Sequence, residues 1–135
     1  MRNSFVLWCW FGLLAACGTP QVTVQTALAI INFAPQDGAT NVDPAADEGV
    51  CFNRQVDATS ARVLPGIADS SGATVSGVTV ANASNQGSSD PFCLAISHPK
   101  LVPGALYQIV VPQGLTASDG STLATTISSR FRTSP

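Results

Sequence analysis

The side chains with the richest chemistry in this 135-residue chain are four cysteines and one histidine. Thiols and imidazoles bind metal ions or act as nucleophiles, and thiols also form disulfides. The sequence has neither a C-x-x-C nor an H-x-x-x-H unit around Cys51, Cys93 and His98. We therefore do not expect these three residues to form a metal site. Cys17 stands apart, because it follows residues 14–16 at the end of the only long apolar run. From its type alone it could be a disulfide half, a metal ligand or an attachment point.

Groups for acid–base catalysis are scarce. Only 10% of the residues are charged, and Glu48, Lys100 and His98 are the single members of their types. His98 precedes Pro99, and we expect it to be an exposed turn residue. With one histidine and no fitting partner, a Ser-His-Asp triad has little support. The sequence therefore argues against an enzyme.

Seven aspartates and one glutamate raise the question of calcium. Asp37, Asp43 and Asp119 fall in turns marked by Gly or Pro, where an aspartate side chain accepts hydrogen bonds from local backbone N–H groups. Calcium requires about six to eight gathered oxygens, and the chain has no D-x-D-x-D cluster. We expect turn chemistry, with no metal and no other cofactor.

The N-terminus predicts export and lipidation. Arg2 precedes an apolar run over residues 5–14, and small residues follow, which is the layout of a secretory signal peptide. The run is shorter than the roughly 20 apolar residues of a transmembrane helix. Leu14-Ala15-Ala16-Cys17 resembles the lipobox of bacterial lipoproteins, in which the bond before the cysteine is cut and its thiol receives a diacylglyceryl group. The resemblance implies a signal peptide at 1–16 and anchoring of Cys17 by several acyl chains, palmitate among them, since a single chain binds membranes only marginally.

A tether at 17–27 and one domain at 28–135 follow. Residues 18–27 are small and polar and reach at most roughly 35 Å, so the domain is expected close to the membrane. An Asp directly after the lipidated cysteine would resemble the inner-membrane retention signal of enteric bacteria, but this position holds Gly18. The resemblance therefore favours anchoring in the outer membrane, on its periplasmic or surface face, in a host that has one. The basic residues are scattered, so they form neither a positive patch that would bind nucleic acid nor one that would bind anionic lipids. Attachment of the protein to the membrane is therefore expected to depend on the lipid at Cys17.

From Leu28 onward the pattern is all-β. Short runs that alternate apolar and polar residues are separated by Gly, Pro, Asn, Asp and Ser. We expect strands at 28–34, 48–54, 62–68, 74–82, 91–97, 105–112 and 125–133. Seven strands at this spacing predict a two-sheet β-sandwich.

The alternation also assigns faces. It directs Cys51 and Cys93 outward. It directs the aromatic residues Phe33, Phe52, Phe92, Tyr107 and Phe131 toward the core. Both tryptophans lie in the signal peptide, so no aromatic platform for stacking a sugar is expected.

One local motif points to a family. Residues 101–107 match the Leu-x-Pro-Gly-x-x-Tyr pattern of the tyrosine corner, with Leu101, Gly104 and Tyr107 as its members and the Tyr hydroxyl bonded to upstream backbone. The domain at 28–135 then resembles the bacterial Ig-like domain of the type found in the S-layer protein SbsA. The matching stretches are 35–42, 50–57, 101–107, 114–115 with 119–120, and 131–133. The resemblance implies an Ig-like two-sheet sandwich of about seven strands.

Cys51 and Cys93 depart from that family pattern. With Cys9 lost in the signal peptide and Cys17 lipidated, they are the remaining thiols, and in an oxidising compartment two thiols are expected to pair. The second and fifth strands of an Ig-like sandwich are antiparallel neighbours, which would place the two residues opposite each other. Our hypothesis is a cross-strand disulfide on the surface.

These observations favour a non-catalytic, lipid-anchored envelope protein whose Ig-like domain is an interaction or accessory module. The alternative is a ligand-binding or inhibitor lipoprotein that recognises an envelope glycan or protein through its loops, with the polar segment 82–90 as the first candidate. Expected partners are the membrane, through the lipid, and an envelope protein or glycan, but not nucleic acid.

Overall fold

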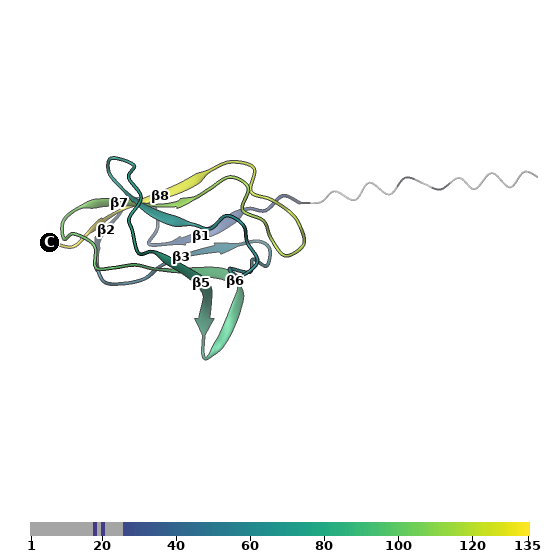
Figure 1. Ribbon diagram of the computed structural model, residues 1–135, viewed down its shortest axis with the longest axis horizontal. Coiled ribbons are helices and arrows are strands. Elements are labelled where there is room, and N and C mark those ends of the chain that lie inside the picture. Colours follow the sequence, from purple (N-terminus) through teal and green to yellow (C-terminus); the bar gives the residue numbers. More distant parts are fainter. Residues whose placement is uncertain (1–17, 19, 21–25) are drawn as a thin grey trace, which may run out of the picture.

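The chain folds into two face-to-face β-sheets. The computed structural model describes Gly18, Pro20 and residues 26–135. Its strands are β1 (Ile30–Ala34), β2 (Ala39–Val42), β3 (Glu48–Phe52), β4 (Gly66–Asp69), β5 (Thr79–Asn85), β6 (Ser88–Ser97), β7 (Leu106–Val111) and β8 (Ile127–Thr133). The sheet orders are β1-β3-β6-β5 and β2-β8-β7-β4, and Figure 1 shows them as two layers. The predicted all-β sandwich is confirmed.

The described chain enters the sandwich at one end and finishes at the other (Figure 1). All strand pairs are antiparallel except β2 with β8, which is parallel. Within the described residues, no helix has the length and apolar character needed to cross a membrane.

The prediction missed β2. After β1 the chain turns at Asp37 and Gly38 and changes sheets, so that β2 pairs with β8 instead of β3. Gly38 adopts a φ of 83° and its N–H donates to the Arg130 carbonyl at 2.7 Å. Four residues with a polar centre are too few to show an alternating pattern, so this strand depends on its pairing with β8.

A second difference concerns residues 82–90, where a loop was expected. β5 and β6 continue into this segment and form a hairpin closed by Gln86 and Gly87, whose φ values are 50° and 83°. Two successive positive φ values are typical of the type I′ turns that suit the twist of a hairpin. The predicted strands at 62–68 and 74–82 are also shorter than expected, since β4 begins at Gly66 and β5 at Thr79.

The core forms from the inward residues of both sheets. Val50, Phe52, Leu94, Ile109 and Phe131 are at most 1% exposed, as the alternation predicted. Burial of this apolar surface supplies the main driving force for folding.

Phe92 was wrongly assigned to the core and is 41% exposed. The β5–β6 register shifts between Asn82 and Ser84, so β6 carries extra residues around Pro91. Proline cannot donate to the ladder and is usual at such bulges, and the irregularity turns Phe92 outward.

The tyrosine corner motif closes the arch between β6 and β7. The Val102 N–H donates to the Tyr107 hydroxyl at 3.1 Å, and Leu101 and Tyr107 are buried. Gly104 has a φ of 70°, and the Tyr107 ring stacks on Phe131 with centroids 6.1 Å apart. The hydroxyl therefore satisfies a backbone donor that the arch leaves without a strand partner.

Tyr107→Phe should lower the free energy of unfolding by about 1 to 2 kcal/mol, because it removes this hydrogen bond and leaves the Val102 N–H without its partner. The ring contact with Phe131 is kept, so the loss reports on the hydroxyl alone. Urea unfolding of both proteins measures the difference, and coincident unfolding curves would contradict the role assigned to the hydroxyl.

Candidate functional site

The two outward cysteines are joined. Cys51 and Cys93 lie directly opposite each other in the β3–β6 ladder, with Sγ atoms 2.04 Å apart and Cα atoms 4.1 Å apart. The predicted cross-strand disulfide is thus present, half-buried on the outer face of the β1-β3-β6-β5 sheet. Oxidised sulfurs are not available as thiolate ligands or nucleophiles.

The disulfide lies in the floor of a groove of about 340 Å³, hereafter the sheet groove. Its floor consists of small residues from all four strands of the sheet, and its rim is polar. The floor residues are Ala34, Gly49, Cys51, Ala83, Cys93 and Ala95, and the rim residues are Asn32, Asp47, Ser84, Asn85 and Asp90.

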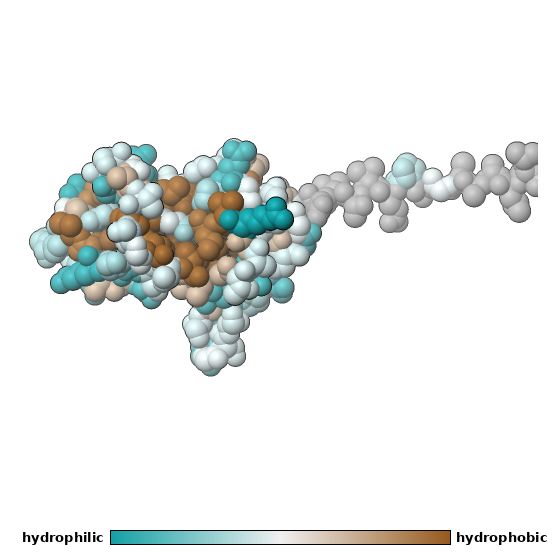
Figure 2. All heavy atoms as spheres, in the orientation of Figure 1, coloured by the Kyte–Doolittle hydropathy of each residue, from teal (hydrophilic) through white to brown (hydrophobic). Residues whose placement is uncertain are grey.

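The β5–β6 hairpin forms one wall of the sheet groove. Figure 1 shows it extending away from the two layers, on the side of the β1-β3-β6-β5 sheet. In Figure 2 its surface is pale to hydrophilic, whereas apolar side chains gather over the body of the domain. The hairpin is therefore a projecting polar element beside an apolar floor.

Asn82 fixes the base of the hairpin. Its half-buried side-chain amide donates to the carbonyls of Val56 at 2.7 Å and Asp90 at 3.2 Å, and its Oδ1 accepts from the Ala58 N–H at 3.0 Å. These three bonds tie the segment after β3 to both strands at the point where the register shifts. Asn82 thus holds the hairpin in place, at the start of the segment 82–90 that the sequence offered as a candidate binding loop.

A second cluster, which sequence reasoning missed, joins the only glutamate to the only histidine. The side chains of Glu48 and His98 are both fully buried, with His98 Nε2 2.5 Å from Glu48 Oε2. The same nitrogen is 2.9 Å from the Ala46 carbonyl, and Nδ1 is 2.8 Å from the Pro99 carbonyl. The expectation that His98 is exposed was wrong. The sequence held one sign of this pair. Glu48 shares the inward phase of β3 with Val50 and Phe52, and a carboxylate buried without a partner is strongly unfavourable, so a partner for it could have been expected.

Burial controls the protonation of Glu48. It raises the pKa of Glu48 from 4.5 to about 7, although the attraction of His98 opposes the rise. Glu48 Oε1 is buried without a hydrogen-bond partner, which favours retention of a proton on the carboxyl. Both ring nitrogens of His98 face protein oxygens, so the pair presents no atom to a substrate and acts as a structural link between the loops at 43–47 and 98–101.

The aspartates mostly serve turns. The Thr59 N–H lowers the pKa of Asp57, and the Ser71 and Ser121 hydroxyls lower those of Asp69 and Asp119. Asp43 Oδ1 accepts from the Ala45 N–H at 2.9 Å, as expected for a turn. Asp37 differs, because its Oδ1 accepts from the distant Arg130 N–H at 2.7 Å and so secures the change of sheets. Across the described residues, no group of three or more His, Cys, Asp or Glu side chains is placed to hold a metal ion.

The sheet orders, the arch with its tyrosine corner and the chain's change of sheets between β1 and β2 define an Ig-like β-sandwich. The chain matches the family model described as a bacterial Ig-like domain over residues 24–133. It belongs to the bacterial Ig-like domain family.

Two solved structures show the same fold. CopC from Methylosinus trichosporium OB3b is 18% identical, with a TM-score of 0.61 over 80% of this chain and 94% of that chain. PcoC, a copper resistance protein from Escherichia coli, is 15% identical, with a TM-score of 0.57 over 78% of this chain and 98% of that chain. Identities this low show the fold alone. A search of curated proteins by sequence finds no match.

Proposed function

We propose that this chain is a lipid-anchored protein of the cell envelope whose single Ig-like domain is a non-catalytic interaction module close to a membrane. Its parts are a signal peptide at 1–16, acylated Cys17 with a tether to residue 27, and an SbsA-type Ig-like domain at 28–135. The signal peptide and Cys17 lie outside the described residues. In a host with two membranes, we place the protein in the outer one.

The observation that carries the proposal is the lipobox-like Leu14–Cys17 directly after an apolar run and just before a folded domain. The end of the tether is tied to that domain: Asn53 Nδ2 donates to the Ala27 carbonyl at 3.2 Å, and the Arg54 guanidinium donates to the Thr26 carbonyl at 3.3 Å. These two hydrogen bonds fix the point at which the tether meets the sandwich.

A binding role is favoured over catalysis by the state of the reactive groups. Glu48 and His98 are sealed inside the domain, and Cys51 and Cys93 are oxidised. The sheet groove with its fixed hairpin is a surface that could take a ligand, which supports the related alternative of a ligand-binding or inhibitor lipoprotein that recognises an envelope protein or glycan.

Copper, which the name of PcoC suggests, does not fit this chain. Copper sites in proteins use imidazole, thiolate and thioether ligands. Here His98 is buried with both nitrogens against protein oxygens, the described cysteines are paired, and the only methionine is Met1. We therefore do not carry copper binding over.

Cys17→Ser should release the protein from the membrane fraction, because serine cannot receive the thioether-linked lipid. The measurement is the distribution of the chain between membrane and soluble fractions after expression in its bacterial host. A matched Cys9→Ser variant, altered within the signal peptide, should still fractionate with membranes. Equal membrane recovery of Cys17→Ser and the unaltered chain would contradict the proposal.

A further inference from the structure

We infer that the sheet groove binds an extended, basic segment of a partner polypeptide, about six residues long. The inference rests on the proposed interaction function and names the surface and the partner chemistry that would serve it.

The floor of the sheet groove is low enough for the backbone of a bound peptide to lie close to it. The solvent face of an antiparallel sheet normally carries polar side chains, yet the outward positions in the floor of the sheet groove are Ala, Gly and Cys. Gly49 has no positive φ, and a Cβ added there would make only an ordinary contact, 3.6 Å from the Leu94 carbonyl oxygen. Neither backbone conformation nor packing requires glycine at position 49. The absence of a side chain there leaves space above the strand.

The floor and wall are fixed before any partner binds. The disulfide joins β3 to β6 in the floor, and Asn82 ties the hairpin wall to the segment at 56–58. A rigid surface loses little conformational freedom on binding, which favours affinity.

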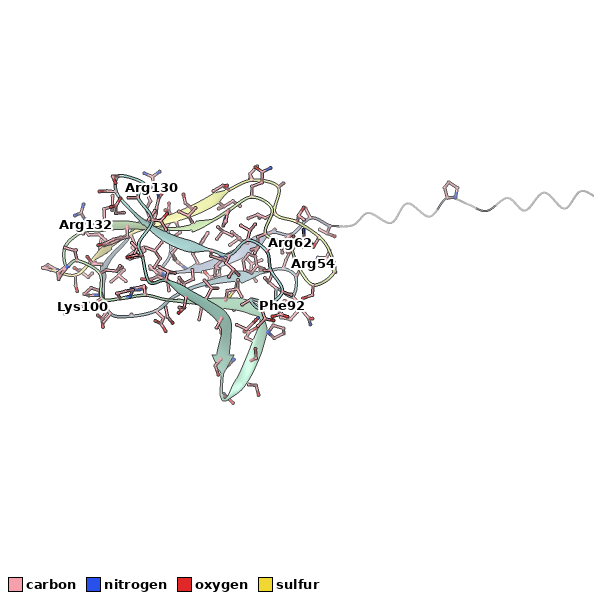
Figure 3. The ribbon with its side chains drawn as sticks, in the orientation of Figure 1. Arg54, Arg62, Phe92, Lys100, Arg130 and Arg132 are labelled. Atoms are coloured by element: carbon pink, nitrogen blue, oxygen red, sulfur yellow. A yellow bond between two sulfur atoms is a disulfide. The ribbon has the colours of Figure 1, made fainter. Side chains whose placement is uncertain are left out.

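The charge of the groove selects a basic occupant. Apart from the buried Glu48, its charged lining residues are Asp47 and Asp90. The five cations of the described chain are Arg54, Arg62, Lys100, Arg130 and Arg132, and none lines the groove. Figure 3 shows them toward the two ends of the domain. Charges of one sign on a surface favour partners of the opposite sign.

The positions of the two carboxylates set the length. Glu48 pairs with Ile96, so Asp47 lies beside Ser97 at one end of β6, and Asp90 lies seven residues away along the same strand. At about 3.3 Å per residue, seven residues span at most about 23 Å, and the bulge around Pro91 shortens this distance, so an occupant of about six extended residues fits between the two carboxylates. No aromatic side chain lines the groove, so a peptide is a better match than a sugar that would stack on a ring.

The test begins with a random octapeptide phage library, selected on the complete chain solubilised in a nonionic detergent. A synthetic copy of the most enriched peptide is then titrated by fluorescence anisotropy. We expect enrichment of peptides with Lys or Arg and small side chains. Asp47→Asn/Asp90→Asn should weaken binding at least tenfold, whereas Asp43→Asn/Asp69→Asn, with the same net charge, should stay within twofold.

A second pair of variants tests the floor. Ala95→Arg fills the sheet groove, whereas Ser128→Arg adds the same side chain to the exposed face of β8 in the other sheet. Only the first should abolish binding, with circular dichroism showing that both fold.

Selection of acidic or uncharged peptides, absence of enrichment, equal effects of the paired variants, or displacement of the peptide by wall glycans would each overturn the inference. The assay does not depend on anchoring, so its failure is distinguishable from failure of the Cys17→Ser experiment.

Discussion

Removing the disulfide should lower the free energy of unfolding by about 3 to 4 kcal/mol. The bond joins residues 42 apart in sequence, and closing a loop of that size reduces the entropy of the unfolded chain by an amount worth about 4 kcal/mol at 25 °C in the chain-entropy model. The variant is Cys51→Ala/Cys93→Ala, and the expected loss corresponds to a melting temperature lower by about 10 to 20 °C in a domain of this size.

Urea unfolding with and without dithiothreitol measures this effect. Reductant should bring the unaltered chain down to the stability of the double variant and leave the variant itself unchanged. If both proteins unfold at the same urea concentration without reductant, the disulfide contributes nothing to stability and does not fix β3 to β6.

His98→Ala should cost about 3 kcal/mol or more at pH 7.5. The change leaves the Glu48 carboxyl buried without the ring nitrogen that faces it, and breaking a buried pair by removing one member is strongly destabilising. At pH 4.5 the cost should be smaller, because a protonated carboxyl is far cheaper to bury than a carboxylate. A cost that does not change between the two pH values would contradict the assigned pairing.

Glu48 also gives the intact domain a pH dependence with a definite sign. Its pKa is about 7 in the folded chain and 4.5 as an unperturbed group, so between these values the unfolded state loses a proton that the folded state keeps. Its contribution is therefore most favourable below pH 4.5 and falls by about 3 kcal/mol as the pH rises through 7.

Glu48→Gln removes this titration and should flatten the profile. Unfolding free energies of both chains, measured between pH 4.5 and 7.5, provide the comparison. Parallel profiles would show that the Glu48 carboxyl does not titrate in this range.

Much of the sandwich could be predicted because its central strands obey a period of two. Val50 with Phe52 and Leu94 with Ile96 alternate with outward residues, and those phases alone placed Cys51 and Cys93 on one face. The errors arise where long-range contacts decide the structure. β2 exists because its short polar segment pairs with β8, and Phe92 is turned outward by the irregularity at Pro91.

The buried pair and the sheet groove were harder to predict. The Glu48–His98 pair joins residues that are 50 positions apart in sequence, and the turn-like setting of His98 before Pro99 concealed it. The sheet groove is made of small outward residues, which carry no periodic signal. Its wall depends on Asn82 bonds to Val56 and Ala58, more than 20 residues away. Local pattern therefore placed both cysteines on the outer face, and their pairing followed from the Ig-like resemblance and an oxidising compartment. Neither the groove nor the buried pair could be found in this way.

We propose that this Ig-like domain is held at a membrane by its first mature residue. Intact-mass analysis of the chain extracted from membranes tests it most directly. We expect one species that begins at Cys17, carries the mass of a diacylglyceryl group with its further acyl chain, and is two hydrogens lighter for the Cys51–Cys93 bond. Recovery of the full, unacylated chain from Met1 would contradict it.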